Sequence, residues 1–336
     1  MGDGRPRVRR VAAGRLAAIG FALLVGTVVA ATREPAAQPD TRIPWIGYLA
    51  NEPTPDSAPI LRDTLRERDW VEGQSVKIWY RYAQGKPDFY AQHADDLVRL
   101  NVNAIVAVGF EAIDAARRAT KTIPIVMVSL DDPVKLAHES GGPATNLTGI
   151  TTFAPEAPAR RVDLLRQVVP RLARAAVLWS SDSAGAPADL RATEAAATAH
   201  GVELTKVEVT AENDVREALR QIDKLHPQGL IVLADAVTLA HRERLAKFAS
   251  RAKLPAVFPS RDFADAGGLL AYGANWTDVF RQTAALVDQI LRGAKPADLG
   301  IRRAARFELV VNLRAARAMP VTVPSALLQR ADRVIE

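Results

Sequence analysis

The sequence predicts an α/β protein built from two doubly wound parallel sheets in succession. From Ile43 onward, short apolar runs alternate with helical patterns, which is typical of βαβ units. The same alternation starts again near Ala175, after a Gly/Pro/Asn-rich segment at Ser140–Gly149. The chain beyond its N-terminal segment is roughly 300 residues long, which is more than one core usually serves. We therefore expect two lobes.

The elements follow in order along the chain. In the first half we expect strands at Trp45–Leu49, Val76–Tyr82, Ala104–Val108 and Ile125–Val128, with helices at Ile60–Arg68, Phe89–Leu100 and Glu111–Ala119. In the second half we expect strands at Ala175–Trp179, Val202–Val209, Leu230–Leu233 and Ala256–Phe258, with helices at Asp189–His200, Val215–Lys224 and Arg242–Arg251. A last amphipathic helix begins at Thr277 and ends at Gly293, where a C-cap is expected.

The N-terminal segment, residues 1–30, has the pattern of a secretory signal peptide. Several arginines precede an uncharged run at Leu16–Ala31, and small residues follow near Ala30. The run is shorter than the roughly 20 apolar residues of a membrane span, although an uncleaved anchor stays open as the alternative. No cysteine follows the run, so the sequence excludes a lipoprotein. Cleavage near Ala30 or after Ala37 would leave a protein located in the periplasm.

Composition and motifs exclude several classes of function. Residues 1–30 carry five arginines and one aspartate, so their removal lowers the net charge from +6 to +2, too little for a nucleic-acid partner. The absence of cysteine removes zinc thiolate sites, and the five histidines do not fall at metal-ligand spacing. The sequence contains no nucleophile elbow, Walker A loop or dinucleotide fingerprint. We expect no metal, no cofactor and no catalytic residue.

Polar residues follow several predicted strands, and this position suggests a ligand-binding cleft. Ligands of open parallel sheets bind beyond the carboxyl ends of the strands. The residues at such ends are Asn51, Glu52, Gly109, Phe110, Glu111, Asp132, Ser180 and Asp235.

Some of these strand-end residues have a second interpretation. Asp132 precedes a proline and serves equally well as a helix N-cap or turn residue. Asp235 is the better candidate, because a carboxylate at a strand end pairs with an ammonium group. Phe110 and Trp179 could stack on an apolar part of a ligand or belong to the core.

Several segments, in order along most of the chain, resemble a known family. They are Val71–Gln74, Ile123–Val126, Asp132–Val134, Asn146–Gly149, Leu254–Phe263, Ala266–Gly273, Gly293–Leu299, Phe307–Asn312 and Arg330–Glu336. Together they resemble ABC-transporter substrate-binding proteins of the tryptophan-import type.

The resemblance implies a type I periplasmic-binding-protein fold, in which two α/β lobes are joined by three crossing segments. The crossings would be residues 148–153, 269–275 and 307–312. The first lobe would combine residues 43–149 with 276–300, and the second would combine residues 150–270 with 313–336.

The resemblance also implies a set of pocket residues, namely Asn51, Gly109, Ser129, Asp132, Thr151, Asp235, Arg261 and Tyr272. The sequence departs from the family pattern after two strands. Phe110 and Glu111 replace a small hydroxyl residue and proline, and Ser180 and Ser181 replace asparagine and proline. Glu111 would favour a more cationic ligand or cap its own helix.

The resemblance implies a receptor, a monomer that closes two lobes around a small polar ligand and delivers it to the membrane permease of an ABC importer. An amino acid or aromatic acid is the expected ligand. A sensory receptor that feeds a signalling partner is one alternative. A hydrolase that uses Glu52, Glu111, Asp132 and Asp235 is another. A repressor with the same fold is disfavoured by the export signal and by the lack of a helix-turn-helix before Ile43.

Overall fold

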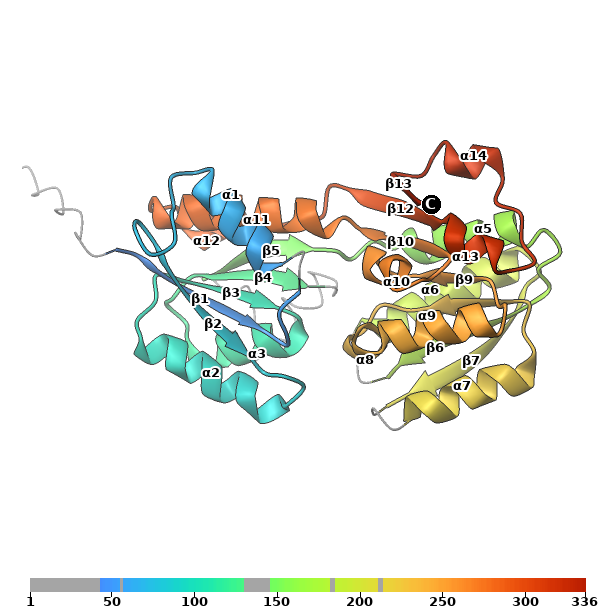
Figure 1. The fold of residues 1–336 in the computed structure, drawn as a ribbon. Coiled ribbons are helices and arrows are strands. Elements are labelled where there is room, and N and C mark those ends of the chain that lie inside the picture. The colour runs from blue at the N-terminus through green and yellow to red at the C-terminus, as the bar shows by residue number, and fades with distance from the viewer. Residues whose placement is uncertain (1–42, 55–56, 130–145, 182–184, 211–213) are drawn as a thin grey trace, which may run out of the picture. The chain divides into compact units, whose positions relative to one another are not determined.

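Two β-sheets organise the chain, one of six strands and one of seven (Figure 1). The computed structural model describes residues 43–54, 57–129, 146–181, 185–210 and 214–336. All of them belong to one compact unit, Ile43–Glu336. The predicted α/β class with two mainly parallel sheets is confirmed.

The first sheet has the strand order β11-β5-β4-β3-β1-β2, and its strand pairs are all parallel. Its strands are β1 (Trp45–Ala50), β2 (Lys77–Tyr82), β3 (Ala104–Val108), β4 (Ile125–Ser129), β5 (Leu147–Thr151) and β11 (Ile301–Arg303). Its helices are α1 (Ala58–Arg66), α2 (Pro87–Arg99), α3 (Phe110–Ala119), α11 (Trp276–Leu291) and α12 (Pro296–Leu299).

Alternation of side chains along the strands decides which helices cover which face of this sheet. Ile46 and Tyr48 of β1 pack with α1 and α11, whereas Leu49 packs with α2 and α3 (Figure 1). Both faces are therefore buried, which explains why the strands are nearly continuous apolar runs.

The second sheet has the strand order β13-β12-β10-β9-β8-β6-β7. Its strands are β6 (Arg174–Ser180), β7 (Glu203–Val209), β8 (Gly229–Val232), β9 (Ala256–Phe258), β10 (Leu270–Ala274), β12 (Phe307–Asn312) and β13 (Arg333–Ile335). Only the β10–β12 pair is antiparallel among the described strand pairs of this sheet.

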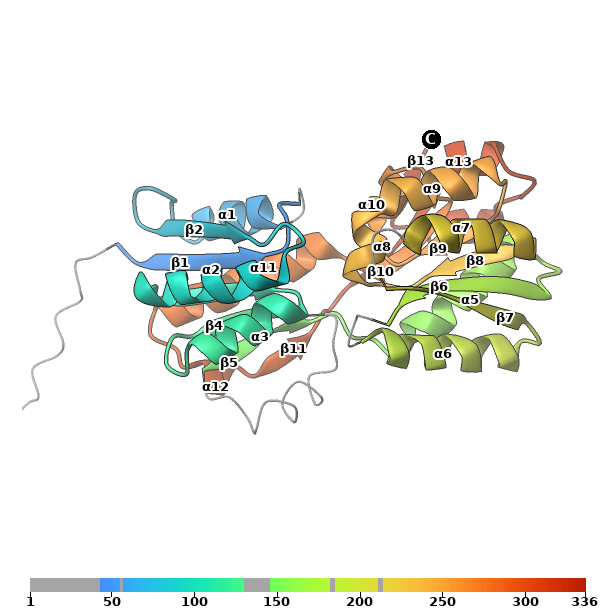
Figure 2. The ribbon, with the colours of Figure 1, turned by 90° about the horizontal axis from the view of Figure 1, so that it is seen from below.

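Helices cover both faces of the second sheet as well. They are α5 (Ala157–Val168), α6 (Ala186–Ala199), α7 (Asp214–Leu225), α8 (Ala236–Ala240), α9 (Arg242–Arg251), α10 (Arg261–Asp265), α13 (Leu313–Arg317) and α14 (Ser325–Leu328). One core contains residues of α5 and α6, and the other contains residues of α7, α9 and α10 (Figure 2).

The chain passes between the two sheets three times, after β5, after β10 and after β11. These passages are bonded to one another. The amide of Ala304 donates to the carbonyl of Thr151 at 2.7 Å, and the amide of Asn275 donates to the carbonyl of Arg306 at 3.0 Å. The side chain of Asn275 also donates to Glu308 at 3.1 Å. The three passages therefore lie side by side.

The structure contains elements that the sequence analysis did not anticipate. Helix α5 and the short strand β11 were not expected. The segments expected at 269–275 and 307–312 as crossings contain β10 and β12, which pair with each other in the second sheet.

Gly273 of β10 marks a close approach between two backbones. A Cβ at this position would lie 1.8 Å from the carbonyl oxygen of Pro259. We expect Gly273→Ala to lower the free energy of unfolding by about 3 kcal/mol, because backbone on both sides must move. Urea denaturation would measure the change.

The matched control for this prediction is Gly300→Ala, where nothing lies within 4 Å of the added Cβ. Its φ of +64° makes alanine strained, at a cost of about 1 kcal/mol. If Gly273→Ala cost no more than this control, the close approach would not constrain the strand.

Candidate ligand-binding site

Ser180 and Asp235 lie together at the carboxyl edge of the second sheet. Strand β6 ends at Ser180, and Asp235 follows β8, its neighbour. The register pairs Leu178 with Val232, which places Ser180 level with the residue before Asp235. The predicted convergence of these two side chains at one sheet edge follows from this pairing.

Both side chains are buried and each has an oxygen without a partner. Ser180 is 0% exposed and Asp235 is 3% exposed. Within the part of the chain that the structure describes, neither Ser180 Oγ nor Asp235 Oδ2 has a hydrogen-bond partner. Buried polar atoms are nearly always satisfied, so these two oxygens at neighbouring strand ends are candidates for contact with a polar ligand group.

The other oxygen of Asp235 is occupied. Oδ1 accepts a hydrogen bond from the amide of Thr238 at 2.7 Å, and the Thr238 side chain accepts from the amide of Asp235 at 3.3 Å. This reciprocal arrangement is a capping box at the start of α8. The carboxylate therefore caps a helix through Oδ1.

Burial raises the pKa of Asp235 from 3.8 to about 6, against an opposing effect of hydrogen bonds from Thr238 and from the backbones of Val237 and Ser180. Among the described residues, no positively charged side chain offsets the burial of this carboxylate. An ammonium group placed beside Oδ2 would supply such a charge.

Two further predicted residues lie in the second sheet. Arg261 begins α10, and its Nε lies 3.7 Å from Asp265 Oδ2. Tyr272 lies on β10, half-buried, with its ring 6.0 Å from that of Phe307. Burial raises the pKa of Tyr272, so its phenol stays protonated at neutral pH.

In the first sheet, Ser129 and Thr151 are brought together as paired residues of β4 and β5. Both are buried. Thr151 Oγ1 accepts from the amide of Phe153 at 3.0 Å, and the carbonyl of Ser129 accepts from the amide of Thr152 at 2.7 Å. These contacts fix the start of the first passage between the sheets.

The ends of β1 and β3 carry the other predicted residues of this sheet. Asn51 Oδ1 accepts from the amide of Gly85 at 2.7 Å, so part of this side chain orders a neighbouring turn. Gly109 has a φ of +92° and precedes α3, a conformation that favours glycine. Phe110 is 38% exposed and Glu111 is exposed, both in the first turn of α3.

The sequence analysis also named Asp132, Trp179 and Glu52 as residues at strand ends. Asp132 lies outside the described residues. Trp179 packs, partly buried, against the core beside α5 and α6, as the core interpretation expected. Glu52 Oε1 lies 3.8 Å from Arg242 Nη1, so it is the partner of a cation.

Arg161 was missed by the sequence analysis. It is 4% exposed, although arginine is seldom buried unless it is paired. A signal was present, because Arg161 shares one helix face with Leu164, Leu165 and Val168 at positions i, i+3, i+4 and i+7. A charge on an apolar face predicts a buried, partnered side chain.

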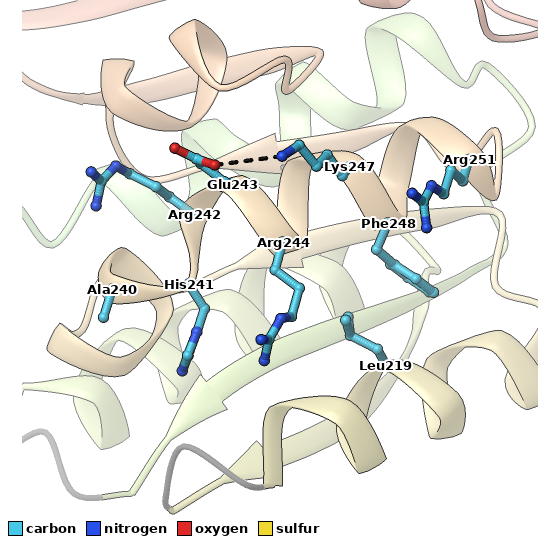
Figure 3. Close-up of a pocket in the computed structure, with 9 residues that line it drawn as sticks. All are labelled: Leu219, Ala240, His241, Arg242, Glu243, Arg244, Lys247, Phe248 and Arg251. Atoms are coloured by element: carbon cyan, nitrogen blue, oxygen red, sulfur yellow. Dashed lines mark hydrogen bonds and ion pairs between the residues drawn. The ribbon is translucent and has the colours of Figure 1, made fainter.

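A cationic hollow of about 560 Å³ lies between α7 and α9 at the end of α8 (Figure 3). Its lining includes His241, Arg244 and Arg251, and its Glu243 is paired with Lys247 at 3.5 Å. None of the predicted ligand residues lines this hollow, so it is a separate surface feature.

Within the described ranges, no group of three or more His, Asp or Glu side chains is placed to hold a metal ion. No helix in that part of the chain combines the length and apolar character needed to span a bilayer.

Comparison with known proteins identifies the family. Residues 59–335 match the model of the family described as ABC transporter substrate binding protein. The chain belongs to this family, whose members are extracytoplasmic proteins that bind solutes.

Individual relatives agree with this assignment. A tyrosine-binding protein of Clostridioides difficile (strain R20291) is 20% identical over 285 residues, which cover 84% of this chain and 81% of that protein. A conserved domain protein from Vibrio cholerae has a TM-score of 0.79 and 26% identity, covering 87% of this chain and 100% of that one. An ABC domain from Streptococcus pneumonia in complex with L-Trp has a TM-score of 0.79 and 23% identity, covering 88% and 100%.

These matches confirm the resemblance and the fold that it implied. The chain has the type I periplasmic-binding-protein fold and is a substrate-binding protein of an ABC transporter.

The raised pKa of Asp235 predicts how stability depends on pH. Between about pH 4 and pH 6 the native state holds a proton that the unfolded chain has released, so burial of this group lowers stability as pH rises. We expect Asp235→Asn to raise the free energy of unfolding by up to about 3 kcal/mol at pH 7, with little change at pH 4. Asparagine is an equally good N-cap, so the helix start is preserved.

Asp288→Asn serves as a control, because we expect it to lower the free energy of unfolding at neutral pH. Burial raises the pKa of Asp288, but hydrogen bonds from Trp70 and Arg292 lower it further, to below its ordinary value. This carboxylate therefore stabilises the fold at neutral pH, and its contribution is lost as the pH falls through the acid range. Urea titrations at pH 4 and pH 7 would compare the variants, and equal effects at both values for Asp235→Asn would contradict the assignment.

Proposed function

We propose that this protein is a periplasmic receptor that binds an amino acid or aromatic acid and delivers it to the membrane permease of an ABC importer. The observation that carries the proposal is the pair of buried, unpartnered oxygens at the carboxyl edge of the second sheet, Ser180 Oγ and Asp235 Oδ2. A ligand ammonium group would satisfy both, since it donates up to three hydrogen bonds and carries the charge that Asp235 lacks.

The ligand class is supported by relatives with the same fold. One relative is named a tyrosine-binding protein, and a solved neighbour holds L-Trp. Both of these amino acids combine an ammonium group with an aromatic side chain. Phe110 and Tyr272 are the aromatic residues that we assign to the apolar part of such a ligand.

We assign each sheet with its helices to one lobe, and the three bonded passages between the sheets to the hinge. Asn51, Gly109, Glu111, Ser129 and Thr151 would complete the site from the first lobe. Ligand binding would then favour the closed arrangement of the two lobes, as in other periplasmic receptors. In this mechanism the protein binds its ligand without converting it, and the hydrolase alternative has no support from the family.

The N-terminal segment fits this role. Residues 1–30 would direct export and then be removed by cleavage. N-terminal sequencing of the protein secreted by its native host would locate the cleavage site.

The protonation state of Asp235 predicts the pH dependence of binding. We expect the affinity for L-tyrosine or L-tryptophan to be constant above about pH 7 and to fall below about pH 6, approaching tenfold per pH unit, because the protonated carboxyl cannot pair with an ammonium group. Isothermal titration calorimetry between pH 5 and pH 8 would measure it.

Analogues without the amino group, such as 3-phenylpropanoate, serve as the control. They should bind weakly and lose this pH dependence. Equal affinity for the analogue and the amino acid would contradict the role of Asp235. A folded protein whose melting temperature is raised by none of these compounds would contradict the ligand class.

A further inference from the structure

The buried guanidinium of Arg161 makes two hydrogen bonds with the described residues. Nε donates to the carbonyl of Tyr272 at 3.1 Å, and Nη1 donates to Asp189 Oδ2 at 3.3 Å. Arginine has five N–H donors, and these two bonds use two of them. The other donors are satisfied only if a further acceptor is present. The described residues supply no further hydrogen-bond acceptor to this side chain.

A small cavity lies beside this guanidinium. Its volume is about 30 Å³, and its lining consists of Thr152, Phe153, Ala154, Ala157, Arg161, Gly185, Asp189 and Ala234. A water-sized atom needs roughly 10–15 Å³ of such space. The cavity therefore has room for about two oxygen atoms, which is the number that a carboxylate group carries.

The residues around the cavity are sequence neighbours or hydrogen-bond partners of three residues of the candidate ligand site. Ala234 directly precedes Asp235, and Thr152 directly follows Thr151. Tyr272 is held through its carbonyl by Arg161 itself. The guanidinium thus lies among the segments that carry three of the proposed ligand residues.

We propose that Arg161 and this cavity form a subsite for the carboxylate group of the ligand. A guanidinium presents its N–H groups as a planar fork that matches the two oxygens of a carboxylate. Asp189 balances the charge of Arg161 when the site is empty, at a distance that leaves donors free. The inference rests on the proposed function and specifies the ligand further. Asp235 would recognise the ammonium group and Arg161 the carboxylate, and the two groups together define an amino acid.

A purely structural role for Arg161 makes different predictions. In that case Arg161 would serve only to hold Asp189 and Tyr272 in place, and breaking these contacts would weaken the binding of every ligand alike. A carboxylate subsite affects only those ligands that have the carboxylate.

The test compares L-tryptophan with L-tryptophanamide, which keeps the ammonium group and the ring but lacks the carboxylate. By isothermal titration calorimetry at pH 7.5, we expect the wild-type protein to bind the amide roughly 10- to 100-fold more weakly than the acid. In Arg161→Met the affinity for the acid should fall to that for the amide, while the affinity for the amide changes little. Arg161→Lys should retain an intermediate preference for the acid.

Arg166→Met is the matched control, because it removes an exposed arginine from the same helix. It should keep the preference for the acid within about threefold of the wild-type value. Asp189→Asn removes a negative charge from the cavity lining but keeps the guanidinium, so we expect it to keep or increase the preference for the acid. If Arg161→Met fails to fold, Arg161→Lys and Asp189→Asn still decide the question.

The outcomes separate the two proposals. Equal wild-type affinity for acid and amide would overturn the carboxylate subsite, and so would an equal loss for both ligands in Arg161→Met or loss of the preference in Asp189→Asn. A wild-type protein that binds neither compound would instead contradict the proposed ligand class.

Discussion

Packing of α11 against the first sheet is the contact on which the two-sheet arrangement depends. This helix follows β10 of the second sheet, yet its residues Val279, Phe280, Leu286 and Val287 are buried in the core of the first. Each such side chain contributes roughly 1.5–3 kcal/mol on burial, so the helix supplies on the order of 10 kcal/mol to that core.

The same contact determines the connection between the sheets. Because α11 belongs to the first sheet and β12 to the second, the chain must return after β11, which gives the three passages. The C-terminal half of the helix is held further by Asp288, which accepts from Trp70 Nε1 at 2.8 Å. The passages are therefore a consequence of core packing rather than of the local sequence at the crossings.

The carboxyl edge of the second sheet is organised differently from the core. Counting described residues alone, Asp235 and Ser180 each keep a buried oxygen without a partner, and Arg161 makes two side-chain hydrogen bonds. Each of these groups lowers stability relative to an apolar residue of the same size. Such costs are tolerated where a ligand supplies the missing partners, which is why we place the proposed ligand at this edge.

By itself the sequence determined strands β1–β4 and β6–β9, the longer helices other than α5, and the positions of Asp235 and Ser180 at strand ends, because apolar periodicity and strand termini are local properties. It did not show that Asp235 divides its two oxygens between a helix cap and an open position. Nor did it show that Arg161 lies beside Tyr272 and Asp189, since those residues are distant in the sequence and meet only through helix–sheet packing. Burial, which raises the pKa of Asp235 and leaves its second oxygen unpartnered, is likewise a property of the assembled sheet, and only the tertiary structure decided it.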